Sequence, residues 1–231
     1  MGHFSWLGHL LHIDHHYVHV AHAALIALLM LLLGLIVRIR LRNTEKHLVP
    51  ASKLSLINIF EVACEGLLTL MEGILGHEAK RYFPFVASLF IFIFLNNLLG
   101  VIPGFLPPTD NFNTTFALGI AVFVYFNYVG LKTQGLAYLK HFMGPVIFLA
   151  PLMLVVEIIG VFVRPLSLAL RLAGNMTGDH MVLGIFSDLV PVVVPVVFLA
   201  LGVFVSFIQA FVFSLLSTIY VGLSLPHEEH H

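Results

Sequence analysis

The sequence predicts an all-α polytopic membrane protein with about five membrane-embedded helices plus one interfacial amphipathic helix. Hydrophobic residues make up 59% of the 231 residues and charged residues only 10%, with a mean hydropathy of +1.01, whereas soluble proteins carry about 25% charged residues. Apolar runs long enough to cross a bilayer recur along the chain. The polar stretches between them are too short for a soluble domain. We therefore expect a His-rich outer tail over residues 1–19 and a single membrane domain over residues 20–231.

The first apolar run, residues 20–37, has no basic residue before it and five after it: Arg38, Arg40, Arg42, Lys46 and Lys53. This order of charges is the reverse of that in a cleaved signal peptide. Since basic loop residues stay on the cytoplasmic side, the N-terminus is expected outside and residues 38–53 inside.

Residues 55–76 place apolar side chains at helical spacing, with Glu61, Glu65 and Glu72 on the other side. This pattern predicts an amphipathic helix on the inner interface, packed on lipid or on a partner. Residues 82–102 and 115–131 are each long enough to span, and the turn-rich connection 103–113 without basic residues is expected outside. Lys132 and Lys140 then mark the inner side again.

Residues 145–225 form a mainly apolar stretch, enough for two helices of about 30 residues or more joined near residues 186–191. Helices of this length must tilt steeply to stay within a bilayer of ~30 Å. We therefore expect the last two helices to be long and tilted, packed against each other through small residues.

Arg171 lies within the apolar run Pro165–Met176. A guanidinium keeps its proton when buried, so an arginine here needs water, an acid or a passing counter-charge, or else its side chain snorkels to the interface. Residues 157, 164 and 171 recur at seven-residue spacing and residues 167, 171 and 175 at four-residue spacing, which predicts one polar helix face. On the last helix, Gln209 belongs to a weaker polar stripe with Ser206, Ser217 and Tyr220. Helix-bridging hydrogen bonds would explain Ser and Gln well, but Glu157 with Arg171 poorly.

The run Pro165-Leu-Ser-Leu-Ala-Leu-Arg171-Leu-Ala-Gly-Asn175-Met, followed by Ile208-Gln209-Ala-Phe-Val-Phe213, resembles subunit a of rotary F-type ATP synthases. The resemblance extends from about Ala51 to the C-terminus and includes Asn97-Leu-Leu-Gly100 and Pro108-Thr109. It implies a stator subunit whose hairpin 145–225 lies against a ring of c subunits, with two offset half-channels that carry ions to and from the ring. The further partners implied are b-type peripheral stalk subunits, the remainder of the ATP synthase and the lipid bilayer.

The resemblance also implies roles for individual residues. Arg171 would be the essential cation, which favours ionisation of a rotor carboxylate and separates the half-channels. The family carries an acid or histidine nine residues beyond this arginine, and often another seven residues before the Gln209 equivalent. Here these positions are His180 and Gly202, and we interpret Asp179 as the replacement for the second group; a solvated acid near a loop is the alternative.

Other residues keep two interpretations each. Glu157 either neutralises Arg164 or lines the inner half-channel. Asn175 and Gln209 orient Arg171 or its water, or bridge helices, and Asn97 faces water or packs. Seven histidines occupy the first 22 residues: His3, His9, His12, His15, His16, His19 and His22. They permit Zn²⁺ or Cu²⁺ binding or proton collection, but a polar tail is the preferred interpretation.

Several classes of function are disfavoured. The net charge of −1 argues against nucleic acid as a partner, and the single Cys64 excludes an internal disulfide framework. No phosphate-cradling Gly-Lys loop occurs, so nucleotide chemistry belongs to partners and no cofactor or metal is expected. The localisation expected is the cell inner membrane, with a cytoplasmic C-terminus. The alternative function is a self-contained ion or anion transporter with an intramembrane arginine, which would favour inverted repeats that the sequence lacks. The choice between H⁺ and Na⁺ stays open.

Overall fold

The computed structural model describes residues 17–40, 56–102, 105, 107–135, 138, 150–189 and 193–226. The regular elements in these ranges are all helices, which confirms the predicted all-α class. The long helices are α2 (Val18–Arg40), α3 (Leu56–Leu75), α4 (Ala79–Leu99), α5 (Phe112–Gln134), α7 (Ala150–Leu189) and α8 (Val193–Leu223), and the short 3₁₀ turns are η2 (Gly76–Glu78) and η3 (Pro108–Asp110). The histidines before residue 17, Lys140 and the last five residues lie outside the described ranges.

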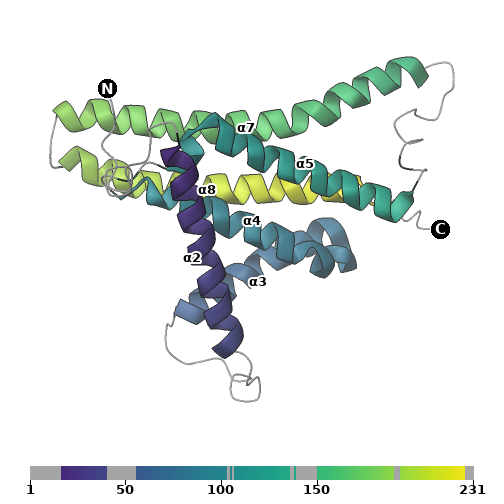
Figure 1. The fold of residues 1–231 in the computed structure, drawn as a ribbon, viewed down its shortest axis with the longest axis horizontal. Helices are drawn as coiled ribbons and strands as arrows, with labels where there is room; N and C mark the ends of the chain where they lie inside the picture. Colours follow the sequence, from purple (N-terminus) through teal and green to yellow (C-terminus); the bar gives the residue numbers. More distant parts are fainter. Residues whose placement is uncertain are drawn as a thin grey trace.

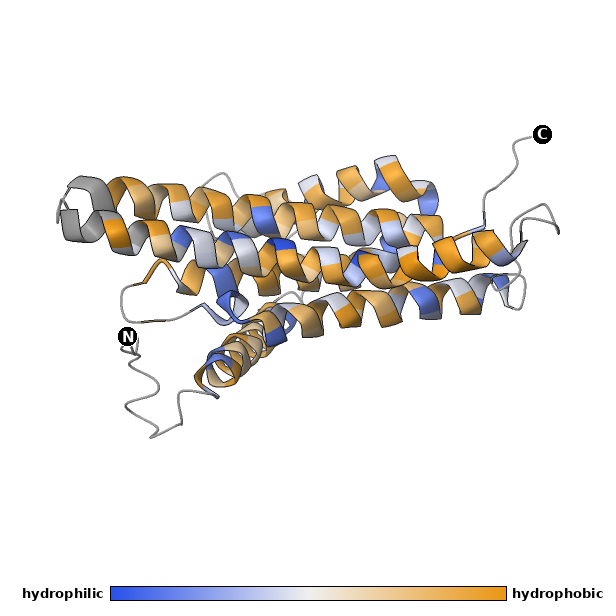
Figure 2. Cartoon of the chain, turned by 90° about the horizontal axis from the view of Figure 1, so that it is seen from above, coloured by the Kyte–Doolittle hydropathy of each residue, from blue (hydrophilic) through white to orange (hydrophobic). Residues whose placement is uncertain are grey.

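Five stretches of the described chain are long and apolar enough to cross a bilayer: residues 18–39, 61–99, 112–134, 151–179 and 196–223, with mean hydropathies of 1.6 to 2.8. Apolar residues cover most of each helix and polar residues are scattered among them (Figure 2). The backbone hydrogen bonds of a helix are formed within the helix itself, so a helix can cross the hydrocarbon core of a bilayer. The chain is a multi-pass membrane protein.

The predicted amphipathic helix is α3, which exposes Glu61, Glu65 and Glu72 and buries Leu67 and Met71. Gly76, in the left-handed region at φ 56°, turns the chain after α3. Because of this turn α3 lies beside α4 instead of in line with it (Figure 1). The 39 residues from Glu61 to Leu99 would measure about 58 Å as one straight helix, far more than a bilayer of ~30 Å. The turn resolves that mismatch.

The two long helices form the frame of the bundle. Helix α7 has 40 residues and α8 has 31, as the sequence predicted, and they run along the length of the molecule (Figure 1). Helix α5 packs chiefly on α7 and α4 chiefly on α8, while α2 crosses the bundle at a steep angle. The core lies where α4, α5, α7 and α8 meet, around the fully buried side chains of Val86, Ile93, Phe126, Leu168 and Val221.

Gly119 permits a close approach of α5 to α7. A Cβ atom built at Gly119 would lie 2.6 Å from the carbonyl oxygen of Pro165, which is backbone and cannot swing away. Since an added methyl group has no space, α5 would have to move off α7. Gly34 on α2 offers a matched comparison because a Cβ there meets nothing within 4 Å.

We expect Gly119→Ala to lower the stability of the protein in detergent by about 1–3 kcal/mol, the usual cost of overpacking. Gly34→Ala should leave stability unchanged or slightly raise it, since alanine is the better helix former. Thermal unfolding of the two variants beside the unmodified protein measures both effects. Equal unfolding temperatures for the two variants would contradict the packing explanation.

Candidate functional site

Arg171 stands on an exposed face of α7. Its neighbours Leu168, Leu172 and Met176 are buried in the bundle, whereas Leu170, Arg171 and Asn175 are exposed. Within the described part of the chain no carboxylate lies within ion-pair distance of Arg171, and no hydrogen bond joins it to Asn175 or Gln209. Gln209 itself is buried in the bundle on α8. Among the described residues Arg171 therefore has no counter-charge, and an arginine in an apolar stretch requires water or an acidic partner.

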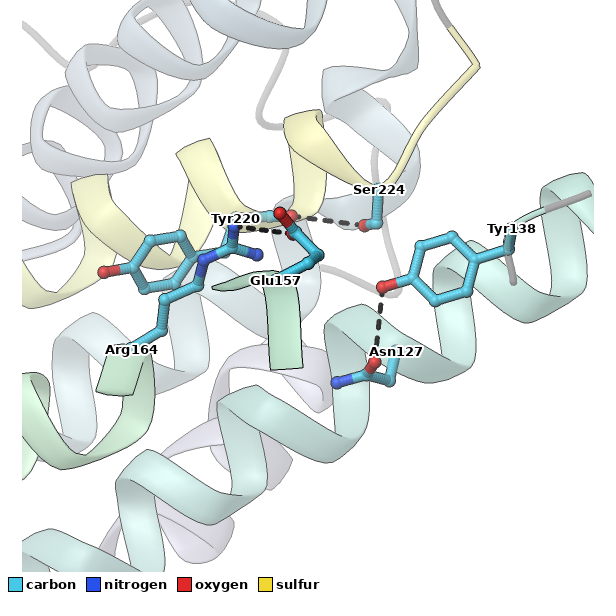
Figure 3. Close-up of polar contacts among 6 residues, drawn as sticks. All are labelled: Asn127, Tyr138, Glu157, Arg164, Tyr220 and Ser224. Carbon is cyan, nitrogen blue, oxygen red and sulfur yellow. Dashed lines mark hydrogen bonds and ion pairs between the residues drawn. The ribbon is translucent and has the colours of Figure 1, made fainter. Parts of the chain in front are cut away.

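Glu157 and Arg164 form an ion pair two turns apart on α7, with 3.3 Å between Oε1 and Nη2 (Figure 3). The Arg164 guanidinium also lies 6.0 Å from the ring centre of Phe126 on α5 and 5.7 Å from that of Tyr220 on α8. The pair is half-buried and faces the packed helices. Two roles were expected for Glu157. The ion pair with Arg164 is consistent with the first of them, the neutralisation of Arg164. Of the three residues at seven-residue spacing, Glu157 and Arg164 form an ion pair, whereas Arg171 forms no ion pair with a described residue.

A second polar cluster lies beside this ion pair (Figure 3). The Tyr138 hydroxyl donates a hydrogen bond to Asn127 Oδ1 at 3.2 Å, and the Gln134 amide donates to the Ser224 carbonyl at 3.0 Å. Burial raises the pKa of the Tyr138 phenol, so the hydroxyl keeps its proton and remains a donor. Sequence patterns did not indicate this cluster, since Ser224 comes from a segment 90 residues away from Gln134.

Asp179 lies well inside α7 and reaches α8. Its Oδ2 is 3.1 Å from the position that a Cβ atom at Gly202 would occupy. The carboxylate is half-buried and lines a small cavity together with Asn97, Ser206 and Gly202. The cavity measures about 10 Å³, close to the space that one water molecule requires. Asp179 is thus a half-buried residue of α7 whose carboxylate lies against α8.

The 3₁₀ turn η3 is held to α4 and α7 by two hydrogen bonds near this cavity. The Thr109 hydroxyl donates to Asn97 Oδ1 at 2.6 Å, and the Thr177 hydroxyl of α7 donates to Asp110 Oδ1 at 2.5 Å. Asn97 is buried, and its Nδ2 has no hydrogen-bond partner within the described structure. A water in the cavity could accept from this group. Asn97 therefore packs in the bundle and lines the small cavity beside Asp179.

The sequence missed two residues of this site, Asp110 and Thr177, and treated Ser206 only as part of a stripe. The Pro-Thr-Asp sequence of residues 108–110 signalled a turn but gave no indication of its partner on α7. His180 follows Asp179 in α7, and its side chain lies outside the described part of the structure.

Fold and site together define a polytopic helical membrane protein with charged groups placed within its membrane helices. The family model for the ATP synthase A chain matches residues 22–222. The chain belongs to the ATP synthase subunit a family.

Similar proteins cover most of the chain. ATP synthase subunit a of Bdellovibrio bacteriovorus is 49% identical over 226 residues, which are 97% of this chain and 99% of that protein. The subunits a of Geobacter sulfurreducens and Geotalea uraniireducens are 52% and 50% identical over 174 residues, 75% of each chain. The resemblance found in the Arg171 and Gln209 motifs is thereby confirmed.

Proposed function

We propose that this chain is the stator subunit a of a proton-translocating ATP synthase, with two offset half-channels that carry protons to and from a c-subunit ring. The observation that carries the proposal is Arg171, an exposed intramembrane cation without a counter-charge within the described chain. A carboxylate on each passing c subunit supplies that counter-charge. The b-type peripheral stalk subunits hold the chain in place, and the remainder of the ATP synthase carries out the nucleotide chemistry.

Arg171 acts on the rotor through charge. A carboxylate moves cheaply through lipid only when protonated, and it releases its proton beside a fixed cation. The same positive charge repels protons, which prevents a direct leak between the half-channels. A transmembrane potential supplies about 2.3 kcal/mol per charge for each 100 mV, and this energy drives the rotation. Asn175, one turn from Arg171, orients the guanidinium or its water, and Gln209 has the same role from α8.

Asp179 is the proton-carrying group of the outer half-channel. It lies eight residues beyond Arg171, about 12 Å along the helix, and lines a cavity with Asn97 and Ser206. Its position against Gly202 supports the interpretation that it replaces a carboxylate on α8. His180, the next residue, extends the same path.

Glu157 and Arg164 belong to the inner half-channel. Glu157 lies fourteen residues before Arg171, about 21 Å along the helix, so it stands on the opposite side of Arg171 from Asp179. The ion pair remains partly exposed, with 24% of the Arg164 side chain and 40% of the Glu157 side chain accessible. The Asp179 site and the Glu157–Arg164 pair thus lie on opposite sides of Arg171 along α7. Two offset half-channels require such an arrangement.

The alternative is a self-contained ion or anion transporter with an intramembrane arginine. Membership of the subunit a family disfavours it, and purification decides between the two. A tag on this chain should copurify a ring of c subunits and the peripheral stalk, whereas an isolated functional chain would support the transporter. ATP-driven acidification of vesicles made with and without sodium then distinguishes H⁺ from Na⁺ as the coupling ion.

We propose that the chain lies in the cell inner membrane. Its N-terminus is outside the cytoplasm, and its C-terminus is in the cytoplasm. In a Cys64→Ser background, single cysteines replacing Gly2 and Asn113 should react with an impermeant thiol reagent from outside, and those replacing Thr44 and Lys132 from inside. Asn113 is exposed, whereas Thr109 is fully buried and would escape the reagent. Reaction of positions 44 and 113 from the same side would refute this topology.

A further inference from the structure

An apolar groove runs between α4 and α5, away from the charged groups described above. It has a volume of about 480 Å³ and is lined by Phe85 of α4 and by three turns of α5 between Ala117 and Tyr128. That volume lies in the range typical of small-molecule sites, about 300–1,000 Å³. The α5 side chains along it are exposed, with 57% of Val124 and 56% of Tyr128 accessible. These residues lie within the membrane-spanning stretch 112–134, so the occupant of the groove must be apolar along its length.

The groove exists because α4 and α5 each pack on a different long helix. Helix α4 lies against α8 and α5 against α7, and direct packing between α4 and α5 is sparse. The stacked rings of Phe85 and Tyr125, with centroids 3.7 Å apart, bridge the two helices. The fold therefore leaves a shallow, open depression at this place on the described bundle.

Basic side chains gather at one end of this groove. Helix α4 begins at the end of the bundle where α5 ends. Measured along the helix axes, Arg81 is therefore about 6 Å beyond Phe85 and Lys132 about 10 Å beyond Tyr125, both toward that end. Lys132 Nζ lies 5.6 Å from the ring centre of Tyr128. Arg81 pairs with Glu78 at 3.6 Å, but an exposed pair of this kind holds its partner weakly. Lys80 adds a third exposed cation beside Arg81.

We infer that this groove binds a phospholipid with an anionic headgroup, whose acyl chain lies along Ala117–Tyr128 and whose phosphate is held by Lys132 and Arg81. Both shape and charge support this occupant, because an open apolar groove ends near exposed basic side chains. Tyr128 lies between the two parts, as amphipathic aromatic residues do at the membrane interface.

A specific lipid site differs from ordinary lipid contact in its preference for one headgroup. Apolar packing alone gives little preference for one site within a membrane, because the surrounding lipid tails are equally apolar. The preference must come from the basic residues, each worth about 1 kcal/mol toward an anionic lipid, which is about fivefold in binding. Selectivity for the headgroup is thus the signature of this site.

The test uses the assembled complex, purified through a tag on a partner subunit so that only assembled chains are measured. The complex is placed in nanodiscs that contain a phosphatidylglycerol with a photoreactive acyl chain, or the matching phosphatidylcholine. After illumination, the labelled fraction of residues 117–128 is measured by mass spectrometry. We expect phosphatidylglycerol to label this segment about fivefold or more above phosphatidylcholine.

Substitutions separate the contribution of charge from that of shape. Lys132→Gln should lower phosphatidylglycerol labelling about fivefold, and Lys132→Gln with Arg81→Gln should bring it to the phosphatidylcholine level. Ala121→Trp fills the groove and should remove labelling by both lipids. Arg38→Gln and Ala24→Trp, an exposed cation and an exposed small residue on α2, are the matched controls and should change nothing.

Two outcomes would overturn the inference. Equal labelling by the two lipids would mean ordinary lipid contact without a site. Absence of lipid label together with disulfide crosslinking of Val124→Cys to a cysteine in a peripheral stalk helix would mean that a protein helix occupies the groove.

Discussion

Arg171→Ala is expected to abolish proton-driven ATP synthesis in membrane vesicles while the complex still assembles. The exposed guanidinium packs on no described acid, so its removal leaves the fold of the chain intact. In the proposed mechanism it also removes the counter-charge of the rotor carboxylate, and a buried charge left without its partner costs about 3–5 kcal/mol. The synthesis rate should therefore fall by at least about a hundredfold. The rate is measured per assembled complex, after quantification of the c ring that copurifies.

Arg171→Lys should also be severely impaired, because an ammonium lacks the planar fork of the guanidinium and can lose its proton when buried. Arg38→Ala, which removes an exposed cation from the end of α2, is the matched control and should keep the normal rate. Near-normal synthesis in Arg171→Ala vesicles would refute the proposed motor function, whatever the effect of the lysine variant.

Asp179→Asn is expected to slow proton-driven synthesis about tenfold or more, since amides cannot carry protons as carboxylates do. The side chain keeps nearly the same shape, so the packing against Gly202 is preserved. Glu72→Gln, on the exposed face of α3, should leave the rate unchanged. Proton flux at the normal rate in Asp179→Asn would show that His180 and water suffice, and Asp179 would then lose its assigned role.

The contact between Asp179 and Gly202 provides a sharper test of the same group. Asp179→Gly combined with Gly202→Glu should recover part of the rate, because the carboxylate returns to the same cavity from α8. Gly202→Glu alone should be worse than the double variant, since a Cβ at Gly202 already comes within 3.1 Å of the Asp179 carboxylate and two acids would share one small space. Assembly is checked first, since a lost buried hydrogen bond could imitate a transport defect. A double variant no faster than Asp179→Gly would contradict the replacement.

The sequence by itself determined the fold class, the five membrane-spanning stretches and the long α7–α8 hairpin. These features depend on length and local hydropathy, because a helix in lipid must satisfy its backbone within its own segment. The sequence also indicated Arg171 as a candidate functional residue, since a permanent charge in an apolar run has few explanations. The Arg171 and Gln209 motifs indicated the family, which the matched relatives confirm.

Only the tertiary structure decided which polar groups meet. Asp179 reaches Gly202 because α7 and α8 pack closely at that level, and Thr177 meets Asp110 because η3 folds back over α7. Glu157, Arg164 and Arg171 share a spacing in the sequence, yet the aromatic rings of α5 and α8 enclose Arg164 and leave Arg171 exposed. The groove between α4 and α5 arises in the same way, from the separate packing of each helix on its own long partner. Helical periodicity fixes which residues share a face, but the neighbour of that face comes from distant segments, and its identity depends on packing between them.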